Sequence, residues 1–192
     1  MARLKEFNPE ERLEKAKQLF WAKGYNATSM KDIVTVMKLN PGSIYSTFGG
    51  KQELFMECLK KYAGERLSAF RQEAGGEGSP LQVLEQVIRE GASVLIREGK
   101  GCMTVRTMLE LGKKNKQAHT VVTSQVKSII DIFEALLVKA QEAGEVHAHR
   151  EPREMAMFLY AGFNGVWQMD ILLNDKRYVN SVIDQLIDSV RR

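Results

Sequence analysis

The sequence has few of the features that would place a chain in a membrane or hold it together with disulfides. No run of about 18 apolar residues occurs in its 192 residues, so we expect no membrane span and no membrane partner. The first residues, MARLKEFNPEER, are charged and lack an apolar signal core, which argues against secretion. Cys58 and Cys102 are the only cysteines, too few for a disulfide framework. We therefore expect a cytoplasmic protein.

Proline is scarce, and strand patterns are absent. Each of the four prolines stands where a helix is expected to begin. No segment alternates between apolar and polar residues for long enough to predict a strand, whereas apolar residues recur at helical spacing. We therefore predict an all-α fold of about nine helices. They cover about residues 9–23, 29–37, 41–48, 51–74, 80–98, 103–112, 117–143, 152–173 and 176–190.

Carboxylates are missing from one part of the chain. The first 62 residues carry 11 Lys and Arg against 7 Asp and Glu, whereas residues 63–192 carry 17 of each. No acidic residue occurs between Asp32 and Glu53, although Lys38 and Lys51 lie in that window. A surface that faces phosphates needs such a local lack of carboxylates, so the pattern favours nucleic-acid binding. A chance fluctuation on a solvated face is the alternative.

Three short helices in residues 8–48, with a tight turn before the third, are typical of a helix-turn-helix. In the third helix, Ile44 and Phe48 are four residues apart, so they share one face and must point at the small core. Short hydroxyl side chains on the other faces would let the helix approach a DNA groove closely, and a tyrosine can reach a phosphate. The side chains turned outward or sideways are then Ser43, Tyr45, Ser46 and Thr47.

Lys51 opens the fourth predicted helix, where the helix dipole favours an anion and a cation costs some stability. A lysine beside free backbone N–H groups is explained if a phosphate binds there. Each single lysine is also consistent with a solvated surface, so the interpretation depends on the whole constellation.

These residues resemble the signature of the TetR family of transcription regulators, in its AcrR-like branch, over about residues 10–60. One departure is Gly50, where a side-chain N-cap is commoner, and it predicts a looser phosphate contact at Lys51. The matching positions are Leu13, Ala16, Leu19, Phe20, Lys23, Gly24, Tyr25, Thr28, Ser29, Met30, Lys31, Asp32, Ile33, Pro41, Gly42, Ser43, Ile44, Tyr45, Phe48, Lys51, Gln52, Glu53 and Leu54.

The resemblance implies a one-component regulator that binds double-stranded operator DNA, and most members of the family repress. It implies phosphate contacts by Thr28 or Ser29, by Tyr45 and by Lys51. It also implies which positions meet base edges. These are Lys31, Pro41, Gly42, Ser43, Ser46 and Thr47.

The resemblance further implies a helix-turn-helix domain in residues 1–50, a connecting helix over about 51–74, and a helical domain in residues 75–192. The second domain would bind a small-molecule or electrophilic effector and form a homodimer through the last two helices. Ala161, Gly162 and Gly165 would allow close helix approach, and the last helix has an apolar face; both features are equally consistent with intramolecular packing. Residues expected at the effector pocket or sensor are Cys102, Met103, Met108, Phe133, Phe158, Phe163 and Trp167.

Cys102 is also a candidate sensor of electrophiles. It lies at a helix start with Lys100 before it and Arg106 one turn later, surroundings that would favour a thiolate. A small buried hydrophobe is the alternative, and the pattern favours it.

Two other classes of function remain to be weighed. An enzyme is disfavoured because no phosphate-cradling glycine loop or metal-ligand cluster occurs, and no cofactor is expected. Cys102 with His119 is the best available pair of nucleophile and base. The spacing His147-x-His149 is weak evidence for a metal. A helical adaptor would need no surface free of carboxylates.

Overall fold

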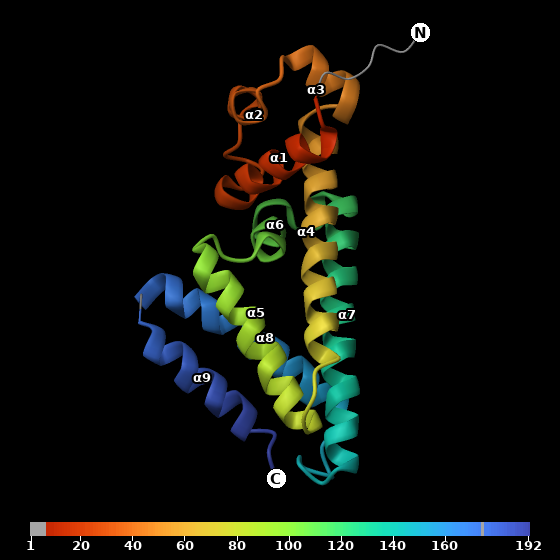
Figure 1. Cartoon of the computed structure of the whole chain (residues 1–192), viewed down its shortest axis with the longest axis vertical. Coiled ribbons are helices and arrows are strands. Elements are labelled where there is room, and N and C mark those ends of the chain that lie inside the picture. Colours follow the sequence, from red (N-terminus) through yellow and green to blue (C-terminus); the bar gives the residue numbers. More distant parts are fainter. Residues whose placement is uncertain (1–6, 174) are drawn as a thin grey trace. The chain divides into compact units, whose positions relative to one another are not determined.

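The computed structural model describes residues 7–173 and 175–192, except for the side chains of Lys113, Trp167, Asp170 and Lys176. Across these residues it contains nine α-helices, one 3-10 helix and no strand, which confirms the all-α prediction (Figure 1). No helix among them is both long and apolar enough to cross a membrane. The elements are α1 (Pro9–Lys23), α2 (Met30–Met37), α3 (Pro41–Phe48), α4 (Lys51–Ala74), α5 (Pro80–Glu98), α6 (Met103–Leu111), η1 (Gly112–Lys114), α7 (Lys116–Glu142), α8 (Pro152–Leu173) and α9 (Lys176–Asp188).

Side-chain caps explain where several helices begin. Asn8, Ser29, Asn40 and Ser79 each accept hydrogen bonds from backbone N–H groups in the first turn that follows. These groups have no partner inside the helix, so a polar side chain before the first turn stabilises it. The short 3-10 helix after α6 was not predicted.

The described chain divides into two compact units, each with its own core. The first contains the residues up to Glu65 together with Cys102–Thr123, and the second contains Arg66–Gly101 together with Ser124–Arg192. In the first unit, Phe20 and Phe55 are buried and meet edge to face, with ring centroids 5.1 Å apart. This aromatic pair joins α1 to α4.

In the second unit, α8 and α9 pack side by side and α5 contacts both (Figure 1). A Cβ atom at Gly162 would lie 2.3 Å from a methyl carbon of Leu186, so the close approach of α8 and α9 needs glycine there. The apolar face of α9 is buried within the protomer. Of the two interpretations of that face, a dimer surface and intramolecular packing, the structure therefore favours intramolecular packing. The buried residues are Val179, Ile183, Leu186 and Ile187 of α9 and Val190 shortly after it.

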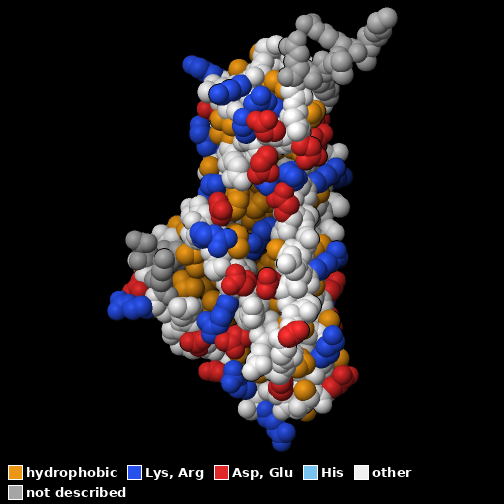
Figure 2. Space-filling model, viewed as in Figure 1, with side chains coloured by type: hydrophobic (Ala, Val, Ile, Leu, Met, Phe, Trp, Pro, Cys, Tyr) orange, Lys and Arg blue, Asp and Glu red, His pale blue; other side chains and the backbone are white. Residues whose placement is uncertain are grey.

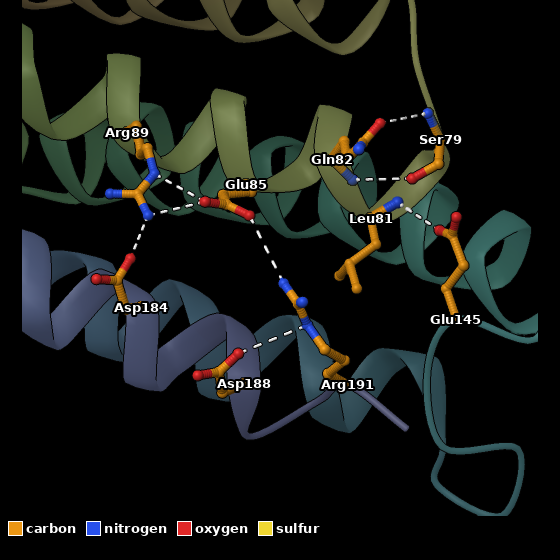
Figure 3. Close-up of polar contacts among 9 residues, drawn as sticks. All are labelled: Ser79, Leu81, Gln82, Glu85, Arg89, Glu145, Asp184, Asp188 and Arg191. Carbon is orange, nitrogen blue, oxygen red and sulfur yellow. Dashed lines mark hydrogen bonds and ion pairs between the residues drawn. The ribbon is translucent and has the colours of Figure 1, made fainter.

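Charged side chains hold α9 to α5 in the second unit (Figure 3). Arg89 on α5 binds Glu85 on its own helix at 2.8 Å and also Asp184 on α9. Arg191 lies 3.9 Å from the other oxygen of Glu85. Backbone pairing of Arg191 with Val146 fixes the end of the chain as well. These contacts hold the C-terminal half of α9 and the residues after it in place.

Candidate DNA-binding site

The outward face of α3 is built from short polar side chains and one tyrosine. Ile44 is fully buried and Phe48 is 5% exposed, whereas Tyr45 is 55% exposed. The helix therefore packs through the two residues that are four positions apart and presents its other faces to solvent. Of the remaining residues, Pro41, Gly42 and Ser46 are exposed, and Ser43 and Thr47 are half-buried.

The turn between α2 and α3 depends on an unusual backbone conformation. Lys38 has a φ of 52°, the only positive φ at a non-glycine position in the described chain. Asn40 then caps α3, its side-chain oxygen accepting a hydrogen bond from the N–H of Ser43 at 2.8 Å. Pro41 occupies the first turn, where its missing N–H costs nothing. This short connection fixes α3 against α2, as a helix-turn-helix requires.

A reciprocal cap starts α2. The N–H of Ser29 donates to the carboxylate of Asp32 at 2.9 Å, and the N–H of Asp32 donates to the Ser29 hydroxyl at 3.1 Å. Lys23 forms an ion pair with the same carboxylate at 2.9 Å. The backbone N–H of Ser29, followed by Lys23, holds the pKa of Asp32 far below its usual value. The Asp32 side chain therefore stabilises the start of α2.

Thr28 is buried rather than presented to DNA. Its side chain is 1% exposed, and its hydroxyl donates to the carbonyl oxygen of Gly24 at 2.6 Å. This bond closes the turn between α1 and α2. Contrary to one of the two expectations, the Thr28 hydroxyl is therefore unavailable to a phosphate. Ser29 is exposed and remains the alternative.

Lys51 lies above an aromatic ring at the start of α4. Its ammonium nitrogen is 4.4 Å from the centroid of the Tyr25 ring. An ammonium over the face of a tyrosine is attracted by the ring quadrupole, so Tyr25 limits where Lys51 can point. Gly50 before it has a φ of 137°, and a Cβ there would lie 3.3 Å from the ring of Tyr45. Sequence reasoning identified Lys51 but missed the role of Tyr25.

Basic side chains gather over α2, as Figure 2 shows. Lys31 and Lys38 are both exposed there. Together with Lys51 they place cations near a helix face that carries no carboxylate of its own. Such an arrangement attracts a polyanion.

Two side chains of α6, in the same unit, bind the end of α1. The guanidinium of Arg106 donates to the carbonyl oxygens of Trp21 at 2.9 Å and of Ala22 at 2.5 Å. The carboxylate of Glu110 accepts from the N–H of Asn26 at 3.0 Å. The last carbonyls of a helix lack partners inside it, so Arg106 satisfies groups that the helix cannot. Sequence reasoning missed these contacts, because they join segments about 85 residues apart.

Cys102 has two hydroxyl groups as neighbours. Its sulfur lies 2.9 Å from the hydroxyl of Thr104 and 3.8 Å from that of Tyr62. Arg106 is directed at α1, and Lys100 pairs with a glutamate of α5 at 3.3 Å. The two basic residues that would favour a thiolate are thus bound elsewhere.

The residues expected at an effector pocket are divided between the two units. Phe158 is 52% exposed, so it lies on the surface rather than in an interior pocket. The side chain of Trp167 lies outside the described part of the chain. The others are Cys102 and Met108, half-buried, and Met103, buried, in the first unit, and Phe133 and Phe163, both buried, in the second.

Two family descriptions match this chain. Residues 13–58 match the family described as "Bacterial regulatory proteins, tetR family", and residues 81–186 match "Tetracyclin repressor-like, C-terminal domain". The second match alone spans more than half of the chain.

Similar proteins support the same assignment. The chain is 26% identical to the HTH-type transcriptional regulator YezE of Bacillus subtilis over 149 residues, 77% of each chain. It is 30% identical to the HTH-type transcriptional repressor BdcR of Escherichia coli over 105 residues, 54% of this chain and 53% of BdcR. A solved cysteine mutant of the TetR-family regulator CifR, complexed with 26-base-pair double-strand operator DNA, superposes with a TM-score of 0.86 at 20% identity. That superposition covers 98% of this chain and 100% of the other. The chain therefore belongs to the TetR family and is a DNA-binding transcriptional regulator rather than an enzyme.

Proposed function

We propose that the protein is a cytoplasmic repressor that binds a palindromic operator as a homodimer and is released by a small-molecule effector. The observation that carries the proposal is the orientation of α3, with Ile44 and Phe48 buried and its hydroxyl-bearing faces accessible. A helix with short side chains can enter the major groove and bring its N-terminal residues to the base edges.

In this proposal, residues 1–50 form the DNA-binding domain, α4 connects, and residues 75–192 bind the effector and dimerise. Ser29, Tyr45 and Lys51 contact phosphates, which position the protein without reading sequence. Residues that meet the bases decide which operator is preferred. They are Lys31, Pro41, Gly42, Ser43, Ser46 and Thr47.

The outer face of α8 is the proposed dimer surface. Met157, Phe158, Met169 and Leu172 on it are 43–72% exposed, although they are large and apolar. A Cβ atom at Gly165 would meet nothing within 4 Å, so this position leaves room for another helix. Since one recognition helix covers half of a palindrome, a second copy of the chain is the occupant that the function requires.

A small molecule is favoured over a thiol-reactive effector by the contacts of Cys102. Lys100 and Arg106, the cations expected to stabilise a thiolate, bind a glutamate and the end of α1. The effector acts by binding more tightly to a dimer whose recognition helices no longer match the operator.

Footprinting on the DNA upstream of the protein's own gene tests the proposal. We expect protection of an inverted repeat, with affinity that falls steeply as salt rises because bound phosphates release counterions. One class of small molecule should abolish the protection. Protection without sequence preference, or none at all, would contradict the proposal.

A further inference from the structure

Arg66 is a buried cation in the second unit. It lies on α4 and is 9% exposed. One guanidinium nitrogen donates to the carbonyl oxygen of Gly91 on α5 at 3.0 Å, and the group lies 5.4 Å from the centroid of the Phe70 ring. Within the described part of the chain, no carboxylate oxygen comes within 4.0 Å of it. The carbonyl and the ring are both neutral, so the direct contacts of Arg66 include no ion pair.

Such an arrangement is costly in the absence of a partner. A guanidinium has five N–H donors and stays protonated at all relevant pH values, so it cannot shed its charge when it is buried. Buried charges in proteins are paired, because desolvation of an isolated ion is unfavourable. The carbonyl of Gly91 accepts one hydrogen bond, so the guanidinium has further N–H groups with which it can bind a ligand.

A cavity adjoins this cation. Its volume is about 80 Å³, and it lies between α4 and α5. Its apolar wall consists of Phe70, Val87 and Val94, and Arg66 lines it too. A cavity of about 150 Å³ holds a benzene molecule, so this space fits a smaller group.

Gly91 keeps this space and the Arg66 contact in place. A Cβ atom there would lie 2.9 Å from the Phe70 ring and 3.1 Å from the Phe163 ring. Any larger residue would therefore push the rings apart and disturb the wall of the cavity.

Two carboxylates at the cavity limit the kind of anion. Glu73 and Glu90 also line it; Glu90 is exposed and accepts a hydrogen bond from Ser93. They repel a doubly charged phosphate about twice as strongly as a singly charged anion, so they favour the singly charged one. The planar fork of a guanidinium matches the two oxygens of a carboxylate.

From these contacts we propose that the Arg66 cavity binds a short-chain monocarboxylate, its carboxylate on Arg66 and its short carbon chain against Phe70, Val87 and Val94. The inference rests on the proposed function in one respect only, that the bound acid is the effector that releases DNA. Binding itself does not depend on that role.

Calorimetric titration of the full-length protein with propionate and with butyrate tests the site. We expect saturable binding by the wild type and at least a tenfold loss of affinity in Arg66→Met. Arg71→Met, which removes an exposed arginine of the same helix, is the matched control and should bind as the wild type does. Gly91→Ala should also weaken binding by obstructing the cavity wall.

Thermal unfolding distinguishes a ligand site from a purely structural arginine. Arg66→Met loses the bond to Gly91 and can unfold at a lower temperature for that reason alone, so the informative quantity is the shift that the ligand causes: butyrate should raise the melting temperature of the wild type and not that of Arg66→Met. Protection of Arg66→Met by butyrate, or equal protection of the wild type by phosphate, chloride or propylamine, would overturn the proposal. If butyrate binds but leaves the operator complex intact, the site stands and the effector role fails.

Discussion

The ammonium group of Lys51 lies 4.4 Å from the centre of the Tyr25 ring, which joins the start of α4 to the turn after α1. This contact positions a cation beside the free N–H groups of a helix start, where a phosphate is favoured. Lys51→Ala should weaken binding to all DNA sequences alike and reduce the slope of log affinity against log salt by about 1.

Tyr25→Leu tests the positioning role separately. It should weaken binding about 2- to 5-fold with little change in that slope, because the charge remains but its position is less defined. Tyr25→Phe retains the ring and serves as the control. Fluorescence anisotropy at several salt concentrations measures both quantities. Equal effects of the leucine and phenylalanine changes would contradict the role of the ring.

Ser43 and Thr47 should affect which bases are preferred. Replacement of either by alanine should change affinity for particular base pairs by about 1–3 kcal/mol while affinity for unrelated DNA stays the same. Selection of binding sites from a randomised library measures this preference. Identical selected sites for wild type and both variants would show that these residues do not read bases.

Arg106 should stabilise the first unit through the end of α1. Its loss leaves the carbonyls of Trp21 and Ala22 without this donor, so Arg106→Ala should lower the free energy of unfolding by about 1–3 kcal/mol. Urea denaturation measures this free energy of unfolding. Arg97→Ala, at an exposed position of α5, should cost much less. Similar costs for the two variants would remove Arg106 from this role.

Asp32 should make stability depend on acid pH. Its pKa in the folded protein is lowered by the Ser29 N–H and by Lys23, so its contribution is fully present above the unfolded pKa of about 4. The contribution is lost as the pH falls through the lower folded pKa. Asp32→Asn should therefore be less stable at neutral pH, and the difference should shrink below about pH 4. Urea midpoints from pH 7 to pH 2 would reveal this convergence, and a constant difference would contradict it.

The exposed side chains of α8 should hold the dimer together. Phe158→Asp with Leu172→Asp places two charges on that face, so we expect monomers and weak operator binding. Light scattering after gel filtration measures the mass. Val138→Asp is the control, since Val138 is a 40% exposed apolar residue on α7. If the α8 changes leave the dimer intact and Val138→Asp disrupts it, the dimer interface lies at α7 and not at α8.

Local chemistry in the sequence was enough to predict the helices and the orientation of α3. Caps, first-turn prolines and the spacing of Ile44 and Phe48 act within a few residues, so a sequence displays them directly. The burial of Thr28 could not be predicted the same way, because a hydroxyl before a helix can cap it, meet a phosphate or bind a carbonyl.

Long-range contacts could not be predicted from the sequence, for a different reason. Arg66 cannot be told from any other arginine of a long helix until α5 brings Gly91 against it. Arg106 lies four residues after Cys102 in the chain, but its guanidinium is directed at α1. The apolar face of α9 has the same pattern whether it meets its own chain or a second copy. Only packing distinguishes these cases.

The central claim is that the exposed faces of α3, together with Lys51 at the start of α4, bind operator DNA. Binding of the operator found by footprinting to the triple variant Tyr45→Phe, Thr47→Ala and Lys51→Ala measures it most directly, with circular dichroism to show that the helices remain. The account predicts at least a hundredfold loss of affinity with the fold intact, from about 3 kcal/mol of lost phosphate and base contacts. Unchanged affinity and sequence preference in this variant would contradict it.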